Sequence, residues 1–245
     1  MISVAAALVA LSPMSQESPA ALVSKMMGKY NKANSVSATI NAVVQTPGGN
    51  VKVDTTLKYV RPSLFYLKQA ETYKSTKNYF VISDGLRFTY PSPGQNRPDT
   101  SRYLVESLVD NQGKTMKVGD IYAAASSSIA DRSTPLDLLV SRVEDLQAIR
   151  GQWATIASGG SVKFNGVAAN MIKGTWKQYG EAQRDWGSYE IFITDDGDLV
   201  GFRLTEPFKI QGKDVKMVTT WTVNAQINVK IDNSTFLLKS KPSRK

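Results

Sequence analysis

The sequence predicts a mainly β protein of the α+β class, in which one strongly curved antiparallel sheet carries a few helices against its concave side. Residues 35–91 read as a meander of five antiparallel strands, and three strand-rich segments follow Trp153. Two helical segments separate these two sets of strands. About ten strands in one sheet is near the size at which an open sheet curls or closes, so we expect strong curvature.

The length and charge of the chain limit its domain count and its partners. A chain of 245 residues suits one all-β domain better than two domains with full cores. The formal charge is +9, but four of the positive charges lie in the last seven residues, "KSKPSRK". Because there is no basic helix, no Cys/His finger and no Gly-aromatic strand signature, we expect no nucleic-acid partner.

Histidine and cysteine are both absent from the chain. Their absence excludes Ser-His-Asp and Cys-His nucleophiles, His-rich metal sites, thiol redox centres and disulfides within this chain. Carboxylate pairs and a lysine nucleophile remain formally open. We therefore expect a protein that is not an enzyme, with no cofactor and no metal.

The first residues indicate export. Residues 2–11, "ISVAAALVAL", form an apolar run with the length of a signal-peptide core, and polar residues follow. A basic start and a clean cleavage site are missing, so the alternative is an apolar arm packed on the domain. We expect a periplasmic or secreted protein, divided into residues 1–16 (signal peptide or arm), 17–238 (one binding domain) and 239–245 (basic tail), and monomeric.

The N-terminal part of the domain predicts a helix followed by long strands. Ser18 suits the N-cap and Pro19 the first turn of an amphipathic helix that runs to about Ala33. Alternation over "SVSATINAVVQ" predicts a half-buried strand, and the turn "TPGGN" leads to a partner strand. The helix presents one apolar face, formed by Leu22, Val23, Met26, Met27 and Tyr30.

The hairpin "YFVISDGLRFTY" carries apolar side chains on both faces. Alternation puts Tyr79 and Val81 on one face and Phe80 and Ile82 on the other, with a tight turn at Asp84-Gly85. One interpretation is a strand covered on both sides by the fold. The other is a curved sheet whose apolar inner face holds a ligand.

The middle of the chain predicts two helices. The first starts near Asp120 and presents a soft face of Ala123, Ala124, Ala125 and Ile129. In the second, Thr134 is the N-cap, Pro135 takes the first turn and Asp137 completes a capping box. Its apolar side consists of Leu136, Leu139, Val140, Val143 and Leu146. Helices inserted into an antiparallel sheet bury such stripes on the sheet, as a plug or lid.

The polar motifs favour structural roles over catalysis. "TDDGDL" places Asp195, Asp196 and Asp198 together, but it lacks calcium-loop spacing and reads as a hairpin turn. The pairs Glu181/Asp185 and Glu144/Asp145 lie in polar surroundings, which indicates solvated faces rather than acid and base groups. The serines of "SSS" at 126–128 have no histidine to activate them.

An apolar set of residues is the remaining candidate site. Large side chains are spread over strands that should be neighbours, and a curved sheet would bring several of them to one concavity. The alternative is an ordinary hydrophobic core. If they form a cavity, lipid is the physically sensible ligand. The candidate lipid-binding residues are Ile40, Val53, Leu57, Phe65, Phe80, Phe88, Trp176, Phe192, Phe202 and Trp221.

The order of these elements resembles the periplasmic lipoprotein-carrier superfamily, the LolA/LolB group with its RseB-type relatives. The resemblance rests on "KMMGKYNKANSVSATI", "YVRPSLFYL", "VISDGLRFTYPSPGQN" and the closing "NVKIDNSTFLL". It implies a LolA-like incomplete β-barrel closed by a helical lid. It also implies non-catalytic transport of lipoprotein acyl chains or related lipids across the bacterial envelope. The lack of cysteine resembles the soluble carrier rather than its lipid-anchored acceptor.

We therefore expect an exported carrier that binds acyl chains of lipid or lipoprotein in the apolar cavity of a half-barrel. The alternative is an envelope sensor or regulatory module that binds a protein partner, such as an envelope membrane protein, through the same fold. An enzyme acting on lipid or glycan ranks third, because the usual catalytic groups are missing.

Overall fold

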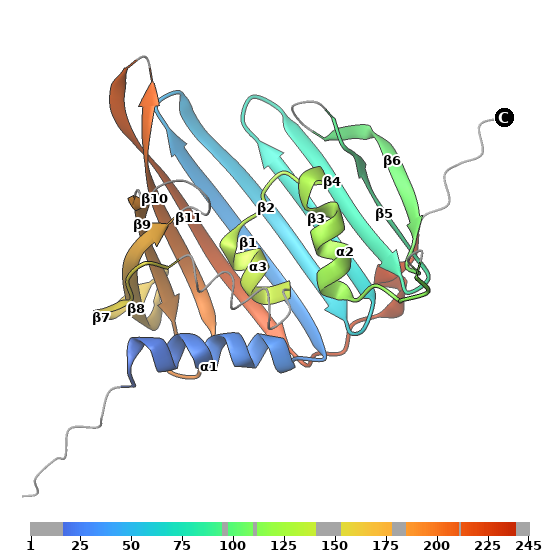
Figure 1. Cartoon of the computed structure of the whole chain (residues 1–245), viewed down its shortest axis with the longest axis horizontal. Helices are drawn as coiled ribbons and strands as arrows, with labels where there is room; N and C mark the ends of the chain where they lie inside the picture. The colour runs from blue at the N-terminus through green and yellow to red at the C-terminus, as the bar shows by residue number, and fades with distance from the viewer. Residues whose placement is uncertain are drawn as a thin grey trace, which may run out of the picture.

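One antiparallel sheet of eleven strands dominates the computed structural model (Figure 1). The structure describes residues 17–94, 98–109, 112–140, 153–177, 185–210 and 212–238. The strands follow the order β6-β5-β4-β3-β2-β1-β11-β10-β9-β8-β7 across the sheet. They are β1 (Ser35–Thr46), β2 (Gly49–Val60), β3 (Leu64–Thr72), β4 (Thr76–Asp84), β5 (Arg87–Ser92), β6 (Asp99–Ser107), β7 (Ala157–Phe164), β8 (Val167–Lys177), β9 (Asp185–Ile193), β10 (Leu199–Ile210) and β11 (Lys213–Ile227).

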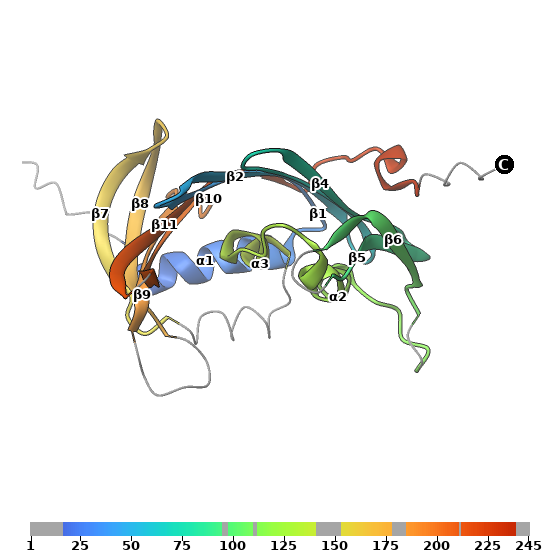
Figure 2. The ribbon, with the colours of Figure 1, turned by 90° about the horizontal axis from the view of Figure 1, so that it is seen from above.

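Two meanders meet at the centre of the sheet. Strands β1 to β6 run outward in one direction and β11 to β7 in the other, and β1 pairs with β11 from Val36 opposite Ile227 to Gln45 opposite Val218. Within the described residues, β6 and β7 each pair on one side only, so the sheet is not closed. Figure 2 shows the resulting arch. The fold is mainly β with an incomplete barrel, which confirms the predicted fold class.

The helices cover the concave side of the arch. Helices α2 (Val118–Ala125) and α3 (Thr134–Val140) lie beneath it, and α1 (Pro19–Lys32) runs along one end of the strands (Figures 1 and 2). A short 3₁₀ turn, η1 (Ser126–Ser128), follows α2 directly. A second one, η2 (Asn233–Phe236), lies outside the arch next to β4.

The main hydrophobic core lies between the concave face and these helices. Along β1, residues Val36, Ala38, Ile40 and Ala42 are buried, and they alternate with more exposed residues on the convex face. They join the same buried cluster as the apolar residues of α1, α2 and α3. A smaller cluster of Phe164, Ala169 and Phe192 lies apart from it. The period-two pattern of the strands therefore sets which face each residue occupies.

Helix α1 is fixed to the turn between β9 and β10. The hydroxyl of Ser18 accepts a hydrogen bond from Ala21 N at 3.2 Å, which confirms the predicted N-cap. The predicted apolar face, from Leu22 to Tyr30, is buried. At the end of the helix, the Tyr30 hydroxyl accepts a hydrogen bond from Leu199 N at 3.1 Å, and burial raises its pKa to about 12.

Several predicted elements are confirmed and three differ in detail. The five strands of residues 35–91 are present, but a sixth, β6, extends this meander. Helix α2 begins at Val118 rather than near Asp120, because the Asp120 carboxylate accepts a hydrogen bond from Lys117 N and so lies inside the first turn. Ile129 lies beyond its end. Of the predicted α3 stripe, Val143 and Leu146 lie outside the described residues, as do residues 1–16 and 239–245.

The surroundings of two glycines predict opposite changes in the free energy of unfolding when each is replaced by alanine. A Cβ at Gly201 of β10 would collide with the Phe164 ring, so Gly201→Ala should lower the free energy of unfolding by about 1–3 kcal/mol. A Cβ at Gly28 of α1 meets no atom within 4 Å, so Gly28→Ala should raise it by about 0.5–1 kcal/mol. Urea unfolding followed by circular dichroism measures both. Equal stability of the two variants would contradict this packing of β10 against Phe164.

Candidate lipid-binding site

Eight of the ten predicted lipid-binding residues lie on the concave face. All eight belong to the main core cluster or pack against it. Seven are at most 5% exposed, and Trp176 is partly buried. The eight inner residues, as we call them, are Ile40, Val53, Leu57, Phe65, Phe88, Trp176, Phe202 and Trp221. They come from seven strands and form one apolar wall.

Phe80 and Phe192 lie on the opposite face of the sheet. Phe80 pairs with Lys68, one residue out of phase with the buried pair Leu67 and Val81, so its ring points to the convex side. Phe192 stacks on Phe164 with ring centroids 4.1 Å apart in the smaller cluster. A shift of one residue along a strand reverses the face. The structure therefore does not bring these two rings together with the inner residues.

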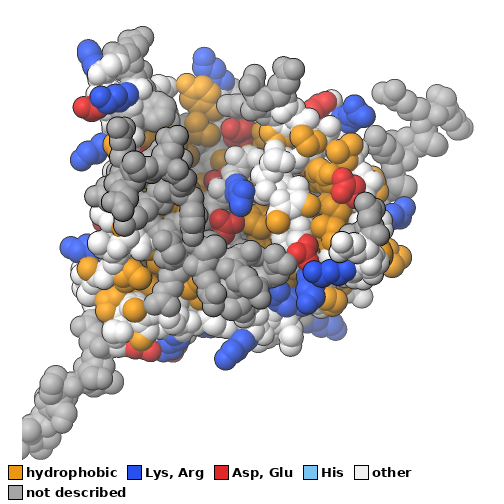
Figure 3. All heavy atoms as spheres, viewed as in Figure 1, with side chains coloured by type: hydrophobic (Ala, Val, Ile, Leu, Met, Phe, Trp, Pro, Cys, Tyr) orange, Lys and Arg blue, Asp and Glu red, His pale blue; other side chains and the backbone are white. Residues whose placement is uncertain are grey.

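The helices cover the apolar wall. Residues 118–140, which include α2, η1 and α3, form what we call the helical cover. Its apolar side chains, including Ile121 and Tyr122 of α2 and Leu136 and Leu139 of α3, are buried in the same cluster as the inner residues. Figure 3 views this covered side and shows hydrophobic side chains over the strands around α2. The inner face is thus packed by helices rather than open over the described residues.

Gln69 of β3 holds the helical cover to the sheet. Its side chain is fully buried and continues the inner-facing series Phe65 and Leu67. The side-chain oxygen accepts hydrogen bonds from Ala130 N at 2.8 Å and Asp131 N at 3.0 Å. The side-chain nitrogen donates to Asp131 O at 2.8 Å. A single amide therefore binds the segment between η1 and α3 in three places.

Sequence reasoning did not find Gln69, although a signal was present. A glutamine in phase with inner apolar residues breaks the hydrophobic alternation of β3. Buried polar groups are hydrogen-bonded in nearly all cases, so such a residue indicates a buried partner. The partner lies about 60 residues away in the chain, and the pattern of β3 alone does not identify it.

Asp131 connects the same segment to an inner residue. Trp221 Nε1 donates a hydrogen bond to the Asp131 carboxylate at 3.0 Å. Burial raises the pKa of Asp131, and the hydrogen bond from Trp221 partly offsets that rise. Two further bonds fix the ends of the cover: Tyr59 Oη donates to Leu139 O at 2.8 Å, and Val118 N donates to Pro62 O at 2.8 Å.

Two buried hydroxyl groups beneath the cover are unsatisfied. Thr55 Oγ1 on the sheet and Ser128 Oγ in η1 have no hydrogen-bond partner among the described residues. A buried polar group without a partner costs about 1–3 kcal/mol. The cover therefore closes over the sheet with an internal cost, which lowers the free energy needed to move it.

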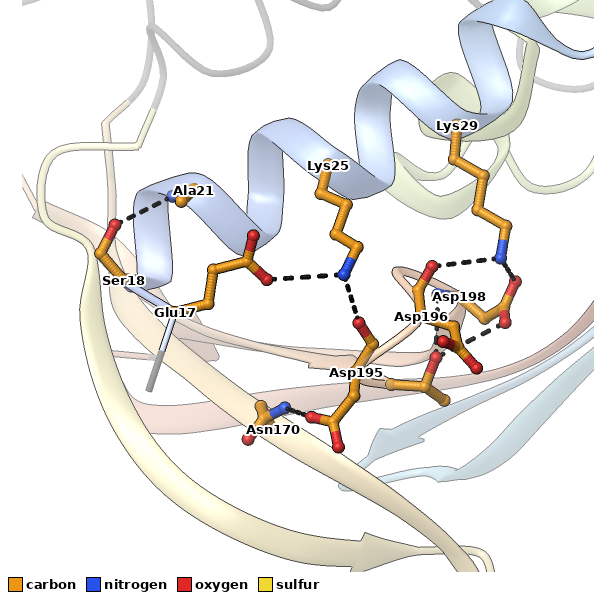
Figure 4. Close-up of polar contacts among 10 residues, drawn as sticks. Glu17, Ser18, Ala21, Lys25, Lys29, Asn170, Asp195, Asp196 and Asp198 are labelled. Carbon is orange, nitrogen blue, oxygen red and sulfur yellow. Dashed lines mark hydrogen bonds and ion pairs between the residues drawn. The ribbon is translucent and has the colours of Figure 1, made fainter. Parts of the chain in front are cut away.

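The acidic turn "TDDGDL" binds lysines of α1 (Figure 4). Lys25 Nζ donates to Asp195 O at 2.6 Å, and Lys29 Nζ lies 2.6 Å from Asp198 Oδ1. Gly197 has φ +82°, which fits the predicted turn. No group of three or more acidic side chains that could hold a metal ion occurs in the part of the chain that the structure describes. The turn thus serves to attach α1.

The carboxylate pairs proposed from the sequence are not assembled into a site by the described residues. Glu144, Asp145 and Glu181 lie outside them, and only the backbone of Asp185 is described, at the start of β9. Ser126 and Ser128 belong to η1, which ends the α2 segment. Within the described ranges, no helix is long and apolar enough to cross a membrane.

Comparisons with known proteins find similar folds only among solved structures. No family model matches the sequence, and no curated protein matches it. LprF from Mycobacterium bovis is similar over 86% of this chain and 93% of its own, with 12% identity and a TM-score of 0.44. A LolA superfamily protein from Nitrosomonas europaea is similar over 90% and 98%, with 9% identity and a TM-score of 0.31.

The third comparison is with MucB in its complex with MucA from Pseudomonas aeruginosa. The similarity covers 89% of this chain and 59% of that chain, with 12% identity and a TM-score of 0.39. At these identities, the three similarities are similarities of fold alone.

The raised pKa of Asp131 predicts a pH-dependent effect of Asp131→Asn. The pKa of the Asp131 carboxyl is higher in the folded state than in the unfolded state. The carboxyl therefore adds to the free energy of unfolding at pH values below its unfolded pKa, and this contribution is lost as the pH rises through its folded pKa. Asparagine keeps an oxygen for Trp221 and carries no charge. The variant should match the wild type near pH 4 and become the more stable of the two towards pH 7, as measured by urea unfolding.

The exposed carboxylate of Asp214 offers a control, because Asp214→Asn removes the same charge from a side chain that is 85% exposed. A stability difference for Asp131→Asn that stays constant from pH 4 to pH 7, or that favours the wild type at pH 7, would contradict the buried-carboxylate interpretation.

Proposed function

We propose that this protein is a non-catalytic, exported carrier of lipid or lipoprotein, and that residues 17–238 form one unit that buries acyl chains. The observation that carries this proposal is an apolar concave wall, built from the eight inner residues, beneath a helical cover held by one buried amide. Acyl chains would lie against this wall when the cover moves away. Phe80 and Phe192 have no part in this inner site.

The energetics favour replacement of the helical cover by an acyl chain on the apolar wall. Burial of each methylene group contributes about 0.8 kcal/mol, so a long chain can replace the apolar contacts that the cover gives up. The three hydrogen bonds of Gln69 oppose this opening, at about 0.5–1.5 kcal/mol each. The unsatisfied hydroxyls of Thr55 and Ser128 favour it. The balance supports a closed state that ligand can open.

The chemistry of the inner face supports binding rather than catalysis. Gln69 on the inner face is engaged with the cover, and the Asp131 carboxylate of the cover is engaged with Trp221. The chain has no histidine or cysteine to act as a base or nucleophile beside them. We therefore assign no catalytic residue, cofactor or metal to the proposed carrier.

A second candidate function is an envelope sensor or regulatory module that binds a protein partner. The observation that favours it is the open sheet, in which β6 and β7 each pair on one side only over the described residues. An exposed strand edge can pair with an extended segment of another protein. Association with an envelope membrane-protein domain, without bound lipid, would favour this function over the carrier.

Gln69→Leu tests the carrier proposal. Native mass spectrometry and organic extraction of the wild-type protein should reveal acylated molecules that purify with it. Leucine removes all three hydrogen bonds to residues 130–131, so the cover should open more readily. We expect 11-(dansylamino)undecanoic acid to enter and leave the variant about tenfold faster than the wild type. This is the change expected when the free energy that favours the closed cover falls by about 1.4 kcal/mol. Stopped-flow fluorescence measures both rates.

Gln45→Leu is the matched control, because Gln45 lies on the exposed side of β1. It should leave both rates unchanged, and circular dichroism should show both variants folded. Wild-type protein that carries no acylated molecule, together with no uptake of the dansyl probe by either variant, would overturn the carrier proposal.

A further inference from the structure

Two neighbouring polar side chains, Thr55 and Gln69, interrupt the apolar wall beneath the helical cover. Thr55 of β2 lies directly opposite Gln69 of β3, and each follows the inner-facing alternation of its strand. Thr55 is only 3% exposed and Gln69 is fully buried. Their neighbours in the same row across the sheet are Ile40 of β1 and Tyr79 of β4. The wall therefore carries two adjacent hydrogen-bonding groups at one level of its strands.

The closed protein does not use the full hydrogen-bonding capacity of this pair. The Thr55 hydroxyl has no partner among the described residues. Gln69 Nε2 carries two N–H groups, and within the described part of the chain it donates to Asp131 O alone. Side chains that lie directly opposite each other have Cβ atoms about 4.5–5.5 Å apart. One acceptor oxygen between the two strands can therefore accept hydrogen bonds from both side chains.

Movement of the cover increases the need for such an acceptor. Gln69 then loses its hydrogen bonds with Ala130 and Asp131. A plain hydrocarbon chain that covers the wall would leave both Thr55 and Gln69 buried without partners, which is unfavourable. Because buried polar groups are hydrogen-bonded in nearly all native structures, the ligand itself must bring an acceptor to this level of the wall.

The polarity of the inner face changes along β3 on either side of the pair. Towards one end, the inner residues are the buried Leu67 and Phe65. Towards the other end, Glu71 accepts a hydrogen bond from Tyr79 Oη at 2.8 Å, and the exposed Lys77 lies opposite Glu71. A hydrocarbon chain suits the first end and a hydrated head group the second. The pair therefore lies where the linkage between chain and head group would lie.

We propose that Thr55 and Gln69 bind the carbonyl oxygen of an acyl ester or amide, the group that joins an acyl chain to a glycerol or peptide head group. Thr55 Oγ1 and Gln69 Nε2 donate hydrogen bonds to this oxygen, while the chain runs towards Phe65 and the head group towards Glu71. The inference rests on the proposed carrier function. It deepens that function by naming the ligand class, acylated glycerol or peptide rather than ether lipid or hydrocarbon.

A matched pair of ligands tests the proposal. 1-Monolauroylglycerol has an ester carbonyl at the position where 1-O-dodecylglycerol has a methylene group, and the two are otherwise alike. Below their micelle concentrations, each should displace 11-(dansylamino)undecanoic acid from the wild-type protein, and the ester should bind at least about fivefold more tightly. Lauroyl ethanolamide is the amide counterpart. The tighter of the two carbonyl ligands identifies a glycerol-type or a peptide-type linkage.

Thr55→Val separates the carbonyl contact from the closure of the cover. Valine keeps the shape of threonine and removes the donor, so the ester should exceed the ether in affinity by no more than about twofold. The variant also loses an unsatisfied hydroxyl, so it should resist urea at least as well as the wild type. A change in closure affects both ligands equally and leaves their affinity ratio unchanged.

Thr56→Val is the matched control, because Thr56 is the next residue of β2 and faces the convex side. Its ester-to-ether ratio should equal that of the wild type. Infrared spectra of bound monolauroylglycerol with a ¹³C-labelled carbonyl provide a second measurement. The carbonyl stretch should lie at lower frequency in the wild type and in Thr56→Val than in Thr55→Val.

The outcomes separate this inference from the carrier function. Equal affinities of ester and ether for the wild type, or the same ratio in Thr55→Val as in the wild type, would overturn the carbonyl site and leave the carrier standing. If the dansyl probe and all three lauryl ligands fail to bind, the carrier proposal itself is overturned.

Discussion

The pairing of β1 with β11 is the constraint on which the rest of the structure depends. It joins strands that begin at Ser35 and Lys213, and so places the two meanders in one sheet. Its register puts Ala42 opposite Trp221 and Ile40 opposite Val223, with all four side chains in the main core. A slip of one residue would turn one set outward. The continuous concave wall therefore exists only in this register.

The same pairing explains how one helix, α1, can contact both meanders of the sheet. Helix α1 precedes β1 directly, and its lysines reach the turn that precedes β10, about 170 residues later. Tyr30 binds the backbone of Leu199 at the start of β10. These contacts join the ends of strands from both meanders, so they add to the central pairing rather than compete with it. Long-range pairing of this kind costs loop-closure entropy, which the shared core must repay.

Much of this fold could be predicted from the sequence, because local alternation and turn residues specify strands. Strand β6 was missed because both of its faces are largely exposed, so "DTSRYLVES" has no regular apolar period. The face of each strand could not be assigned in full, because alternation separates Phe80 from Val81 without saying which one turns towards the helices. The inner site was predicted as a set of large apolar residues, and eight of ten share one wall. Its polar contacts with the cover, through Gln69 and Asp131, depend on tertiary neighbours.

The two faces of β4 show how one strand can serve two different environments. Its inner residues, Tyr79 and Val81, pack in the interior, where close packing leaves little space. Its outer residues, Phe80 and Ile82, are only half-buried, and β5 pairs with the strand only at Ile82–Thr89 and Ser83–Phe88. Alternation along the strand therefore gives its two apolar faces different surroundings, one packed in the interior and one half-exposed on the convex side.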